Sequence, residues 1–357
     1  MSAVRQGAPV HATGESLMTR SKRLGLMLWP VPGLDAGFAR GRWAEDAGFD
    51  DLWFPDAEGM QDPISLAAAL AVSTRRIRLC TGVVPVFNRP PAVLATGVSV
   101  ITEQAPGRFV LGLGSSTSNM VDRWYGVPFK RPLTHVREYV ALLRQIFAGE
   151  KTHFKGELLR SEGFRLQALP GVALPIHLGA MGPKMLQLAG EVADGVVLND
   201  FTPLDRLAWA MEQLDLGAKR RGRRAEDLEI VKRRAVVVIS SPEEEVHARE
   251  FFRQHFAFYA SAPVYQTMIE QLGYPEAVAE VRAGYAARDR ARVTRAITDE
   301  MVSRIFLFGS VAHCHAQLRA HYAQGIDTLV ISPQATSAAE FMRGAEVFAA
   351  AAFNPAG

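Results

Sequence analysis

Cysteine is scarce in this chain of 357 residues, and excess charge of either sign is missing. The two cysteines, Cys80 and Cys314, lie far apart and form neither a disulfide framework nor a CxxC pair. This usage is typical of a reducing compartment, so we expect a cytoplasmic protein. The 40 Lys and Arg against 37 Asp and Glu leave a net charge of only +3. That balance argues against a nucleic acid or an anionic membrane surface as the partner.

Long apolar runs are absent from the N-terminal region. Residues 1–22 are polar with few apolar interruptions, and they lack the continuous apolar stretch of a secretion signal. We therefore expect a flexible extension over residues 1–22, no membrane insertion, and a single domain over residues 23–357. With 48% hydrophobic residues overall, the chain can bury a sizeable core.

Several familiar functional motifs are missing as well. The run 112–114 lacks the third glycine of a dinucleotide fingerprint, and neither a Walker A sequence nor a GxSxG elbow occurs. His313 and His315 lie two residues apart in an expected helix, where they point about 200° from each other, so one ion cannot bind both. We expect no metal site. The basic stretch 219–224 is interpreted as a solvated loop, because it separates a helical pattern from a strand pattern.

What the chain does have is a regular alternation of short apolar runs with helical patterns, from Leu24 onward. This alternation is typical of parallel strands joined by crossover helices. Eight such runs indicate an α/β fold of the (β/α)8 TIM-barrel type rather than an open sheet. The runs cover residues 24–29, 51–54, 77–84, 108–114, 176–178, 196–198, 233–239 and 327–331.

Two segments interrupt the alternation. Within residues 149–170, the stretches 152–154 and 164–166 have strand character and flank a glycine turn, which predicts an inserted hairpin. Residues 243–325, between the seventh and eighth strands, are dominated by helical patterns. They predict a helical insertion that can serve as a lid or a dimer surface.

Residues 175–200 have the pattern of a strand, a glycine turn, a helix and a second strand, which makes a complete βαβ unit. The turn from Gly179 to Gly182 precedes Pro183 at a first helical position. Four unpaired amides and the positive end of the helix dipole are expected to meet there. This combination predicts a phosphate site. An ordinary α/β connection with a tight turn is the alternative that these residues alone leave open.

In a (β/α)8 barrel the ligand binds at the C-terminal ends of the strands, so the residues that follow each run are the site candidates. Glycines there let the backbone approach a planar ring and a phosphate chain, and Ser115 and Ser116 offer hydroxyls. Asp56 and Glu58 are candidate catalytic residues, a paired acid and base, although carboxylates after a strand also form turns and cap helices. The candidates are Trp29, Pro30, Asp56, Glu58, Gly82, Val83, Gly114, Ser115, Ser116, Gly179, Ala180, Met181, Gly182, Asn199, Asp200 and Ser332.

Five stretches along nearly the whole chain carry a family resemblance. They are Pro55-Asp56-Ala57-Glu58-Gly59 with Asp62-Pro63, Cys80-Thr81-Gly82-Val83 with Asn88-Arg89-Pro90, the run 106–114, Gly126-Val127-Pro128-Phe129 before Arg137-Glu138-Tyr139, and the block 179–195. Together they resemble the bacterial luciferase-like superfamily of flavin and deazaflavin oxidoreductases. The likeness is greatest to the branch that uses the deazaflavin coenzyme F420.

The resemblance implies an oxidoreductase that transfers a hydride between coenzyme F420 and a small organic substrate, commonly as a homodimer. It implies that the turn 179–182 binds the coenzyme's phosphate and that Ser115 and Ser116, beside Gly114, help to hold its side chain. It further implies a non-prolyl cis peptide between Gly82 and Val83, behind the ring, and Asp56 near the polar edge of the ring.

Two departures from the family pattern narrow the substrate. The sugar-phosphate dehydrogenases of this branch carry a histidine just after the position of Asp56 and a glutamate just after that of Gly114, where this chain has Ala57 and Ser115. A sugar phosphate is therefore not expected, and the proton donor stays open. A monooxygenase that uses reduced FMN is the first alternative, disfavoured because no rim histidine matches. A flavin- or deazaflavin-binding protein without turnover is the second.

Overall fold

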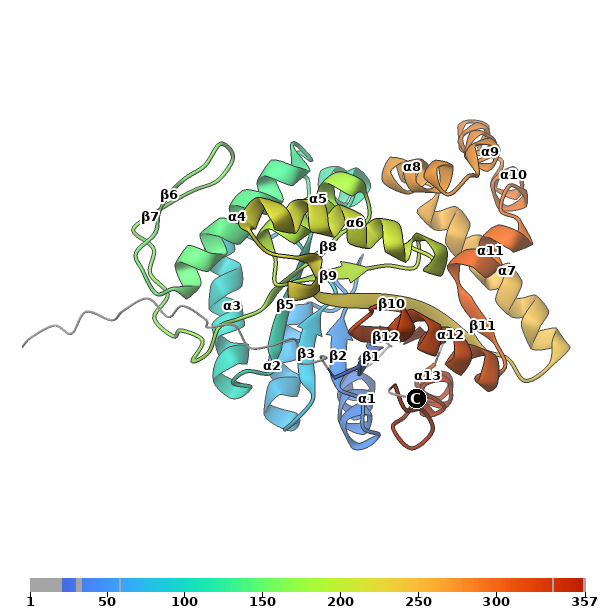
Figure 1. Ribbon diagram of the computed structural model, residues 1–357, viewed down its shortest axis with the longest axis horizontal. Helices are drawn as coiled ribbons and strands as arrows, with labels where there is room; N and C mark the ends of the chain where they lie inside the picture. The colour runs from blue at the N-terminus through green and yellow to red at the C-terminus, as the bar shows by residue number, and fades with distance from the viewer. Residues whose placement is uncertain (1–20, 30–33, 58, 336, 356–357) are drawn as a thin grey trace, which may run out of the picture.

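The computed structural model describes residues 21–29, 34–57, 59–335 and 337–355, and its centre is a closed barrel of eight parallel strands (Figure 1). The barrel closes because the seventh strand pairs with the sixth and the eighth, and the eighth pairs with the first. The predicted (β/α)8 barrel is therefore confirmed. Its strands are β1 (Arg23–Met27), β2 (Asp51–Phe54), β3 (Arg78–Thr81), β5 (Phe109–Gly114), β8 (Ile176–Gly179), β9 (Gly195–Leu198), β10 (Glu229–Val238) and β12 (Thr328–Pro333).

Helices surround the barrel, and proline sets where several of them begin. A proline stands in the first turn of α2, α3, α4 and α5, where its missing N–H costs no hydrogen bond. Asp62 caps α2 by accepting a hydrogen bond from the amide of Ser65 at 2.7 Å. The surrounding helices are α1 (Leu34–Asp46), α2 (Pro63–Ser73), α3 (Pro91–Gln104), α4 (Pro132–Phe147), α5 (Pro183–Val192), α6 (Leu207–Ala218), α12 (Val311–Ala323) and α13 (Ala338–Glu346).

A layer of apolar side chains fills the middle of the barrel. Because alternate residues of a strand point to opposite faces, each barrel strand sends one residue in two inward. Trp53 is the largest of these and is fully buried. A Cβ on Gly25 of β1 would lie 2.9 Å from its ring, so glycine is required opposite it. The buried layer consists of Met27, Trp53, Cys80, Val110, Val231 and Val330.

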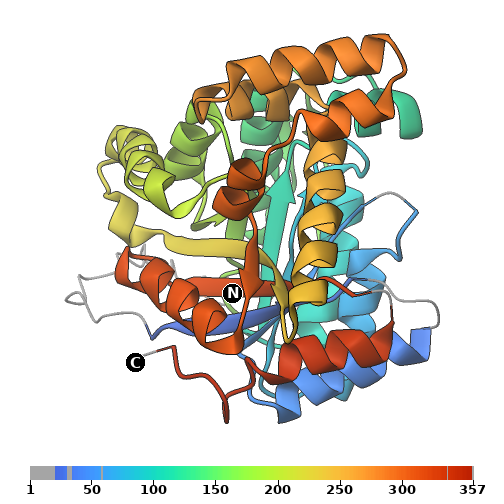
Figure 2. The same cartoon turned by 90° about the vertical axis from the view of Figure 1, so that its right-hand side faces the viewer.

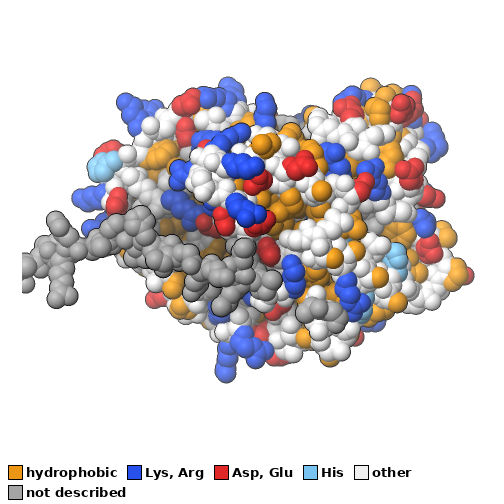
Figure 3. All heavy atoms as spheres, viewed as in Figure 1, with side chains coloured by type: hydrophobic (Ala, Val, Ile, Leu, Met, Phe, Trp, Pro, Cys, Tyr) orange, Lys and Arg blue, Asp and Glu red, His pale blue; other side chains and the backbone are white. Residues whose placement is uncertain are grey.

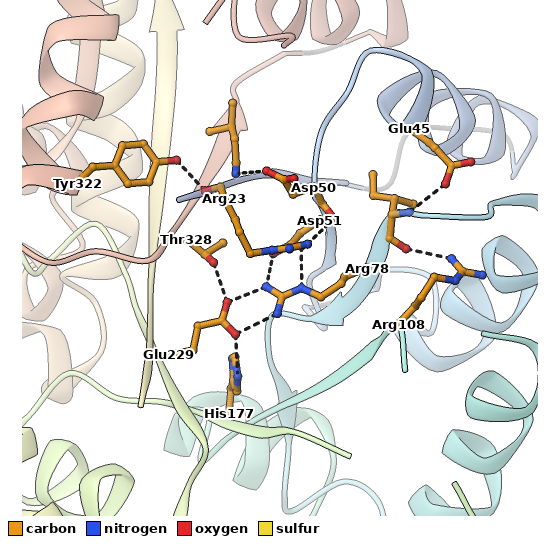
Figure 4. Close-up of polar contacts among 12 residues, drawn as sticks. Arg23, Glu45, Asp50, Asp51, Arg78, Arg108, His177, Glu229, Tyr322 and Thr328 are labelled. Carbon is orange, nitrogen blue, oxygen red and sulfur yellow. Dashed lines mark hydrogen bonds and ion pairs between the residues drawn. The ribbon is translucent and has the colours of Figure 1, made fainter. Parts of the chain in front are cut away.

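A network of charges closes the N-terminal end of the barrel (Figure 4). The carboxylate of Asp51 is fully buried and accepts hydrogen bonds from Arg23 and Arg78 at 2.6 Å each. Arg78 also donates to both oxygens of Glu229, at 3.0 and 2.6 Å, and the Thr328 hydroxyl donates to Glu229 at 2.7 Å. Every buried carboxylate here has cationic partners, so this end of the barrel is filled and the opposite end is left for a ligand.

The segment between β10 and β12 is mostly helical but also contains a strand that the sequence patterns did not reveal. Strand β11 (Leu307–Gly309) extends the sheet by pairing in parallel with the C-terminal part of β10. The helices of this segment pack around a second core that contains Phe252, Phe256 and Phe306. They lie to the right in Figure 1 and come forward in Figure 2. The helices before β11 are α7 (Pro242–Tyr259), α8 (Pro263–Gln271), α9 (Pro275–Ala286), α10 (Arg290–Arg295) and α11 (Asp299–Ile305).

The second strand of the inserted hairpin lies earlier in the chain than predicted. Strand β6 (His153–Lys155) pairs with β7 (Arg160–Glu162), not with residues 164–166. Glu138 of α4 sets this register, because its carboxylate accepts hydrogen bonds from the amides of residues 157, 158 and 159 in the turn. The prediction that residues 164–166 form the second strand was therefore wrong, and the strand lies at residues 160–162.

In the described part of the chain, no helix combines the length and apolarity that crossing a bilayer requires. Basic and acidic side chains are interspersed on the face shown in Figure 3.

Candidate functional site

The mouth of the barrel is shaped by a break in the third strand. Strand β3 ends at Thr81, and the chain resumes pairing with β5 only at β4 (Val84–Pro85). The Gly82–Val83 peptide between them is cis, as the resemblance implied. The hydroxyl of Thr81 replaces the lost ladder bonds, since it donates to the carbonyl of Gly112 and accepts from its amide, both at 2.8 Å. The Thr81 hydroxyl thus satisfies the backbone groups of Gly112 opposite the break.

The displaced Val83 lies in a cradle of glycines from the two following strands. A Cβ on Gly114 would lie 2.6 Å from Cγ2 of Val83, and a Cβ on Gly179 would lie 3.1 Å from the same methyl. A Cβ on Gly112 would meet the carbonyl oxygen of Thr81 at 1.9 Å. We predicted that rim glycines make room for a ligand, but Gly114 and Gly179 make room for Val83. The close packing in this glycine cradle fixes the position of the Val83 side chain at the barrel mouth.

The turn after β8 leads into α5, with Gly182 as its N-cap residue. A Cβ on Gly182 would meet nothing within 4 Å, so this position is open. The turn has fewer free amides than the four expected, because Pro183 has no N–H and the amide of Met185 donates to the carbonyl of Gly182 at 3.1 Å. The amides of Gly182 and Lys184 have no partner among the described residues. The exposed side chain of Lys184 adds a cation to the positive end of the helix.

The other residues of the turn have different surroundings. Ala180 is buried, and its amide donates to the carbonyl of Val197 at 3.2 Å, so it belongs to the sheet. The Met181 sulfur accepts a hydrogen bond from the Asn199 amide at 2.7 Å, which ties the turn to the end of β9. Only the Gly182 end of the turn therefore has the geometry of an anion site.

Asp56, at the end of β2, is held by an arginine. Arg89 donates to Asp56 and to Asp62, at 2.5 Å each, and the hydroxyl of Tyr139 donates to the Arg89 carbonyl at 2.8 Å. The Asp56 side chain keeps only 10% of its surface exposed. Glu58 lies outside the described residues, so its pairing with Asp56 stays a prediction. The structure gives Asp56 an anchoring role, and the acid–base role also stays a prediction.

Ser115 and Ser116 follow β5 directly. Both are half-buried, and Ser116 adopts a left-handed backbone conformation with φ of 60°. The Ser116 hydroxyl donates to the sulfur of Met120 at 3.1 Å, and that of Ser115 donates to the Ser116 carbonyl at 3.3 Å. These are weak contacts that a ligand can replace.

A search of known families matches residues 8–328 to the model described as luciferase-like monooxygenase. The chain belongs to this family. The resemblance read from the sequence motifs is confirmed.

The relatives of this luciferase-like protein include reductases. It is 34% identical over 273 residues to a 5,10-methylenetetrahydromethanopterin reductase of Archaeoglobus fulgidus, covering 75% of this chain and 80% of that one. It is 31% identical over 319 residues to a Mycobacterium tuberculosis protein provisionally named a coenzyme F420-dependent oxidoreductase, covering 81% and 88%. The solved coenzyme F420-dependent tetrahydromethanopterin reductase of Methanopyrus kandleri has the same fold, with a TM-score of 0.76 at 21% identity over 92% of this chain and 99% of that one.

The luciferase-like chain also carries a charged residue at the mouth that the sequence patterns did not single out. Arg233 of β10 donates to the buried carboxylate of Asp200 at 2.5 Å and lies 3.5 Å from the hydroxyl of Tyr259. Its guanidinium carbon lies 6.0 Å from the centre of the Trp29 ring. Burial alone would lower the pKa of Arg233, but Asp200 and the hydroxyls of Tyr259 and Tyr265 together outweigh burial, so the pKa is raised. Basic residues at 232–234 between the apolar stretches 230–231 and 235–238 were the signal that could have revealed it.

Aromatic side chains from the insertion cover this part of the mouth. Phe201, after β9, makes edge contacts with Tyr259 of α7 and Tyr265 of α8 at centroid distances of 5.3 and 4.9 Å. Across the mouth, the Trp29 indole N–H donates to the hydroxyl of Ser332 at 2.6 Å. The site thus has a polar glycine edge at β8 and an aromatic edge at β9, β10 and β1.

Proposed function

We propose that this protein is an oxidoreductase that transfers a hydride between coenzyme F420 and a small organic substrate at the barrel mouth. The observation that carries the proposal is the glycine cradle of Val83 beside the open amides of Gly182. Val83 packs against Gly179 at the end of β8, and the anion site at Gly182 follows the same strand. An apolar support and an anion site thus lie close together, as a planar ring with a phosphate-bearing side chain requires. The F420-dependent enzymes among the relatives support the choice of coenzyme.

Each group at the mouth has a role in this proposal. The amides of Gly182 and Lys184, with the Lys184 ammonium, bind the phosphate, and the Val83 side chain supports the ring. Ser115 and Ser116 hold the coenzyme side chain. When bound, the coenzyme supplies the hydride chemistry, and the protein supplies position and electrostatics.

The remaining mouth residues define the substrate side. Trp29 and Tyr265 exclude water from the reacting centre, and the Arg233 guanidinium favours a substrate with a carbonyl or carboxylate oxygen. Asp56, fixed by Arg89, is assigned to the polar edge of the ring. Glu58 is retained as a candidate acid or base.

We further propose a cytoplasmic homodimer. Exposed valines on α2 and α3, at Val72, Val93 and Val100, support an interface on that side. Cys80 and Cys314 are both free and buried, which agrees with a reducing compartment.

An anaerobic turnover assay tests the proposed reaction. Reduced F420 is mixed with the protein and a panel of carbonyl and imine acceptors, and oxidation of the coenzyme is followed by its absorbance. Oxidation by at least one acceptor is expected, and Gly182→Asp serves as the binding-deficient control. The family description also names monooxygenases, so reduced FMN with oxygen is tested in parallel. Turnover with reduced FMN and oxygen alone would overturn the proposal, and no turnover with either coenzyme would favour a binding protein.

A further inference from the structure

The seventh barrel strand places a cation at the mouth, opposite the broken third strand. Val231 of β10 belongs to the buried layer inside the barrel, and alternate residues of a strand share a face, so Arg233 also points inward. Strands β5, β8 and β9 separate β10 from β3 on one side of the barrel, and β2, β1 and β12 separate them on the other. Arg233 therefore lies across the mouth from Val83, which supports the coenzyme ring in the proposed function.

One half of the Arg233 guanidinium is anchored and the other half is available. Nη2 donates to Asp200 at 2.5 Å and lies 3.5 Å from the hydroxyl of Tyr259. Nε is enclosed and has no partner among the described residues. Nη1 also has no hydrogen-bond partner among them, but it is not one of their enclosed polar atoms, and 12% of the side chain is exposed. Nη1 is thus the atom through which this charge meets a ligand.

The charge of Arg233 is only partly compensated. Arg234 is protonated as well, and the buried carboxylate of Asp200 acts on both arginines. In the part of the chain that the structure describes, only Arg233 of the two forms an ion pair with Asp200. Lys232 adds a third basic group beside them, fully buried, and donates to the carbonyl of Asn199. The cluster thus holds at least one excess positive charge, and Arg233 presents it at the mouth because Arg234 is only 4% exposed.

Aromatic side chains surround this cation. The centre of the Trp29 ring lies 6.0 Å from the guanidinium carbon, and the rings of Tyr259 and Tyr265 lie 4.7 Å apart beside it. All three side chains are half-buried, so each keeps some surface for an apolar ligand body. An ion pair is stronger in such a poorly solvated place than in water.

The amount of excess charge indicates which anion fits. A carboxylate brings one negative charge, which balances one excess cation. A phosphomonoester brings nearly two, and the second would lie close to the carboxylate of Asp200. A planar carboxylate also matches the flat face of N–H donors that a guanidinium presents.

We infer that the substrate of this protein carries a carboxylate apart from the carbon that exchanges the hydride, and that Nη1 of Arg233 binds this carboxylate. The contact orients the substrate, since it holds one end of the molecule at β10 while the coenzyme ring lies on Val83 across the mouth. The assignment to the substrate rests on the proposed function. The presence of a carboxylate site at Arg233 does not.

Fluorescence titration of the full-length protein with three naphthyl compounds tests the carboxylate site. The probes are 2-naphthoate, the neutral 2-naphthamide and the more highly charged 2-naphthyl phosphate. Naphthoate is expected to bind at least about tenfold more tightly than either of the others, because only its contact with Arg233 is charge-assisted without a second charge beside Asp200. Equal binding of naphthoate and naphthamide, or tighter binding of the phosphate, would overturn the inference.

The same titrations with F420 separate this inference from the proposed function. Saturating F420 is expected to leave naphthoate bound, and displacement of naphthoate would assign Arg233 to the coenzyme and overturn the substrate role. Naphthoate binding in a protein that does not bind F420 would refute the proposed function and leave the carboxylate site standing. F420 binding without a preference for naphthoate would do the reverse.

Variants locate the preference at Nη1. Arg233→Gln is expected to abolish the preference for naphthoate over naphthamide. Arg233→Lys keeps a positive charge for Asp200, so it applies even where Arg233→Gln fails to fold, and it is expected to lose most of the preference because its single nitrogen pairs with Asp200. Arg295→Lys makes the same change at an exposed position on α10 and is expected to have no effect. An unchanged preference in Arg233→Lys would contradict the role of Nη1.

Turnover with reduced F420 then tests the role in the reaction. The acceptors are 4-formylbenzoate and its neutral match 4-formylbenzamide. KM is expected to be about tenfold lower for the benzoate, and Arg233→Lys is expected to remove this difference with little change for the benzamide. Equal KM values in the wild-type protein would show that Arg233 does not select the substrate.

Discussion

The glycine cradle of Val83 predicts that one methyl group added at Gly114 lowers the stability of the protein. Gly114→Ala would place its Cβ 2.6 Å from Cγ2 of Val83, well inside van der Waals contact. Val83 cannot give way easily, because it packs closely on the backbones of Gly179 and Gly112. A Cβ on Gly179 would lie 3.1 Å from the same methyl group, and a Cβ on Gly112 would lie 3.2 Å from the other. The β-branched side chain also has few alternative rotamers. The added methyl must therefore displace Val83 or the strand behind it.

The size of the effect follows from overpacking. Gly114→Ala is expected to lower the free energy of unfolding by roughly 1–3 kcal/mol, the usual cost of an extra methyl in a packed site. Val83→Ala removes both γ-methyl groups, and the nearest remaining atom, Cβ of residue 83, lies 3.7 Å from the new methyl. In that background Gly114→Ala is expected to cost less than about 0.5 kcal/mol, because the contact is ordinary. The two substitutions should thus be strongly non-additive.

Urea unfolding of the four proteins in this double-mutant cycle measures the coupling. Coenzyme F420 affinity is the second readout, and Gly114→Ala is expected to weaken it more in the Val83 protein than in the Val83→Ala protein. Additive effects of the two substitutions on unfolding would refute the steric account of Gly114.

Two further predictions concern charge. Gly182→Asp is expected to keep or slightly raise stability, because Asp is a good N-cap at this open position, and to weaken coenzyme F420 binding on the order of 100-fold through repulsion of the phosphate. Gly182→Asn, the uncharged control, should lose much less affinity, and equal losses would exclude a charge effect. Burial alone would raise the pKa of Glu229, but Arg78 and its other partners lower it to about 2. The charge therefore stabilises the fold by roughly 3 kcal/mol above the normal glutamate pKa, and this contribution is lost as pH falls toward 2. Glu229→Gln should cost most of that at pH 7, and its difference from the wild type should shrink between pH 5 and pH 3. A gap that stays constant over that range would contradict the assignment.

Sequence patterns predicted the barrel well because most barrel strands are apolar runs followed by a helical pattern; β10 (Glu229–Val238) is the exception, since charged residues occupy its first half and it begins four residues before the predicted run. Strand β11 escaped this reading, since Leu307 to Gly309 is only three residues long and is specified by pairing with the far end of β10. The hairpin register was misplaced because Glu138, on the preceding helix α4, determines it by accepting hydrogen bonds from the turn amides. Both errors reflect partners that a local pattern cannot show.

The candidate site was predictable in part. Gly182, at a helix start, and the cis peptide at Gly82–Val83 could be placed from motifs. The steric reason why residue 114 must be glycine could not be predicted, because it depends on where the Val83 side chain points after the break in the third strand. Arg233 was missed for a related reason. A basic residue in a strand can point into the barrel or outward toward the helices, and the sequence pattern does not distinguish the two. Only the closed sheet shows that Arg233 faces Asp200 at the mouth.

Parallel equilibrium titrations of the purified protein with coenzyme F420 and with FMN test the central claim most directly. Protein and ligand fluorescence report binding, and Gly182→Asp serves as the site control. We predict saturable F420 binding that the control variant loses, with FMN binding at least about tenfold more weakly, a difference of about 1.4 kcal/mol. Tight FMN binding without F420 binding would contradict the account.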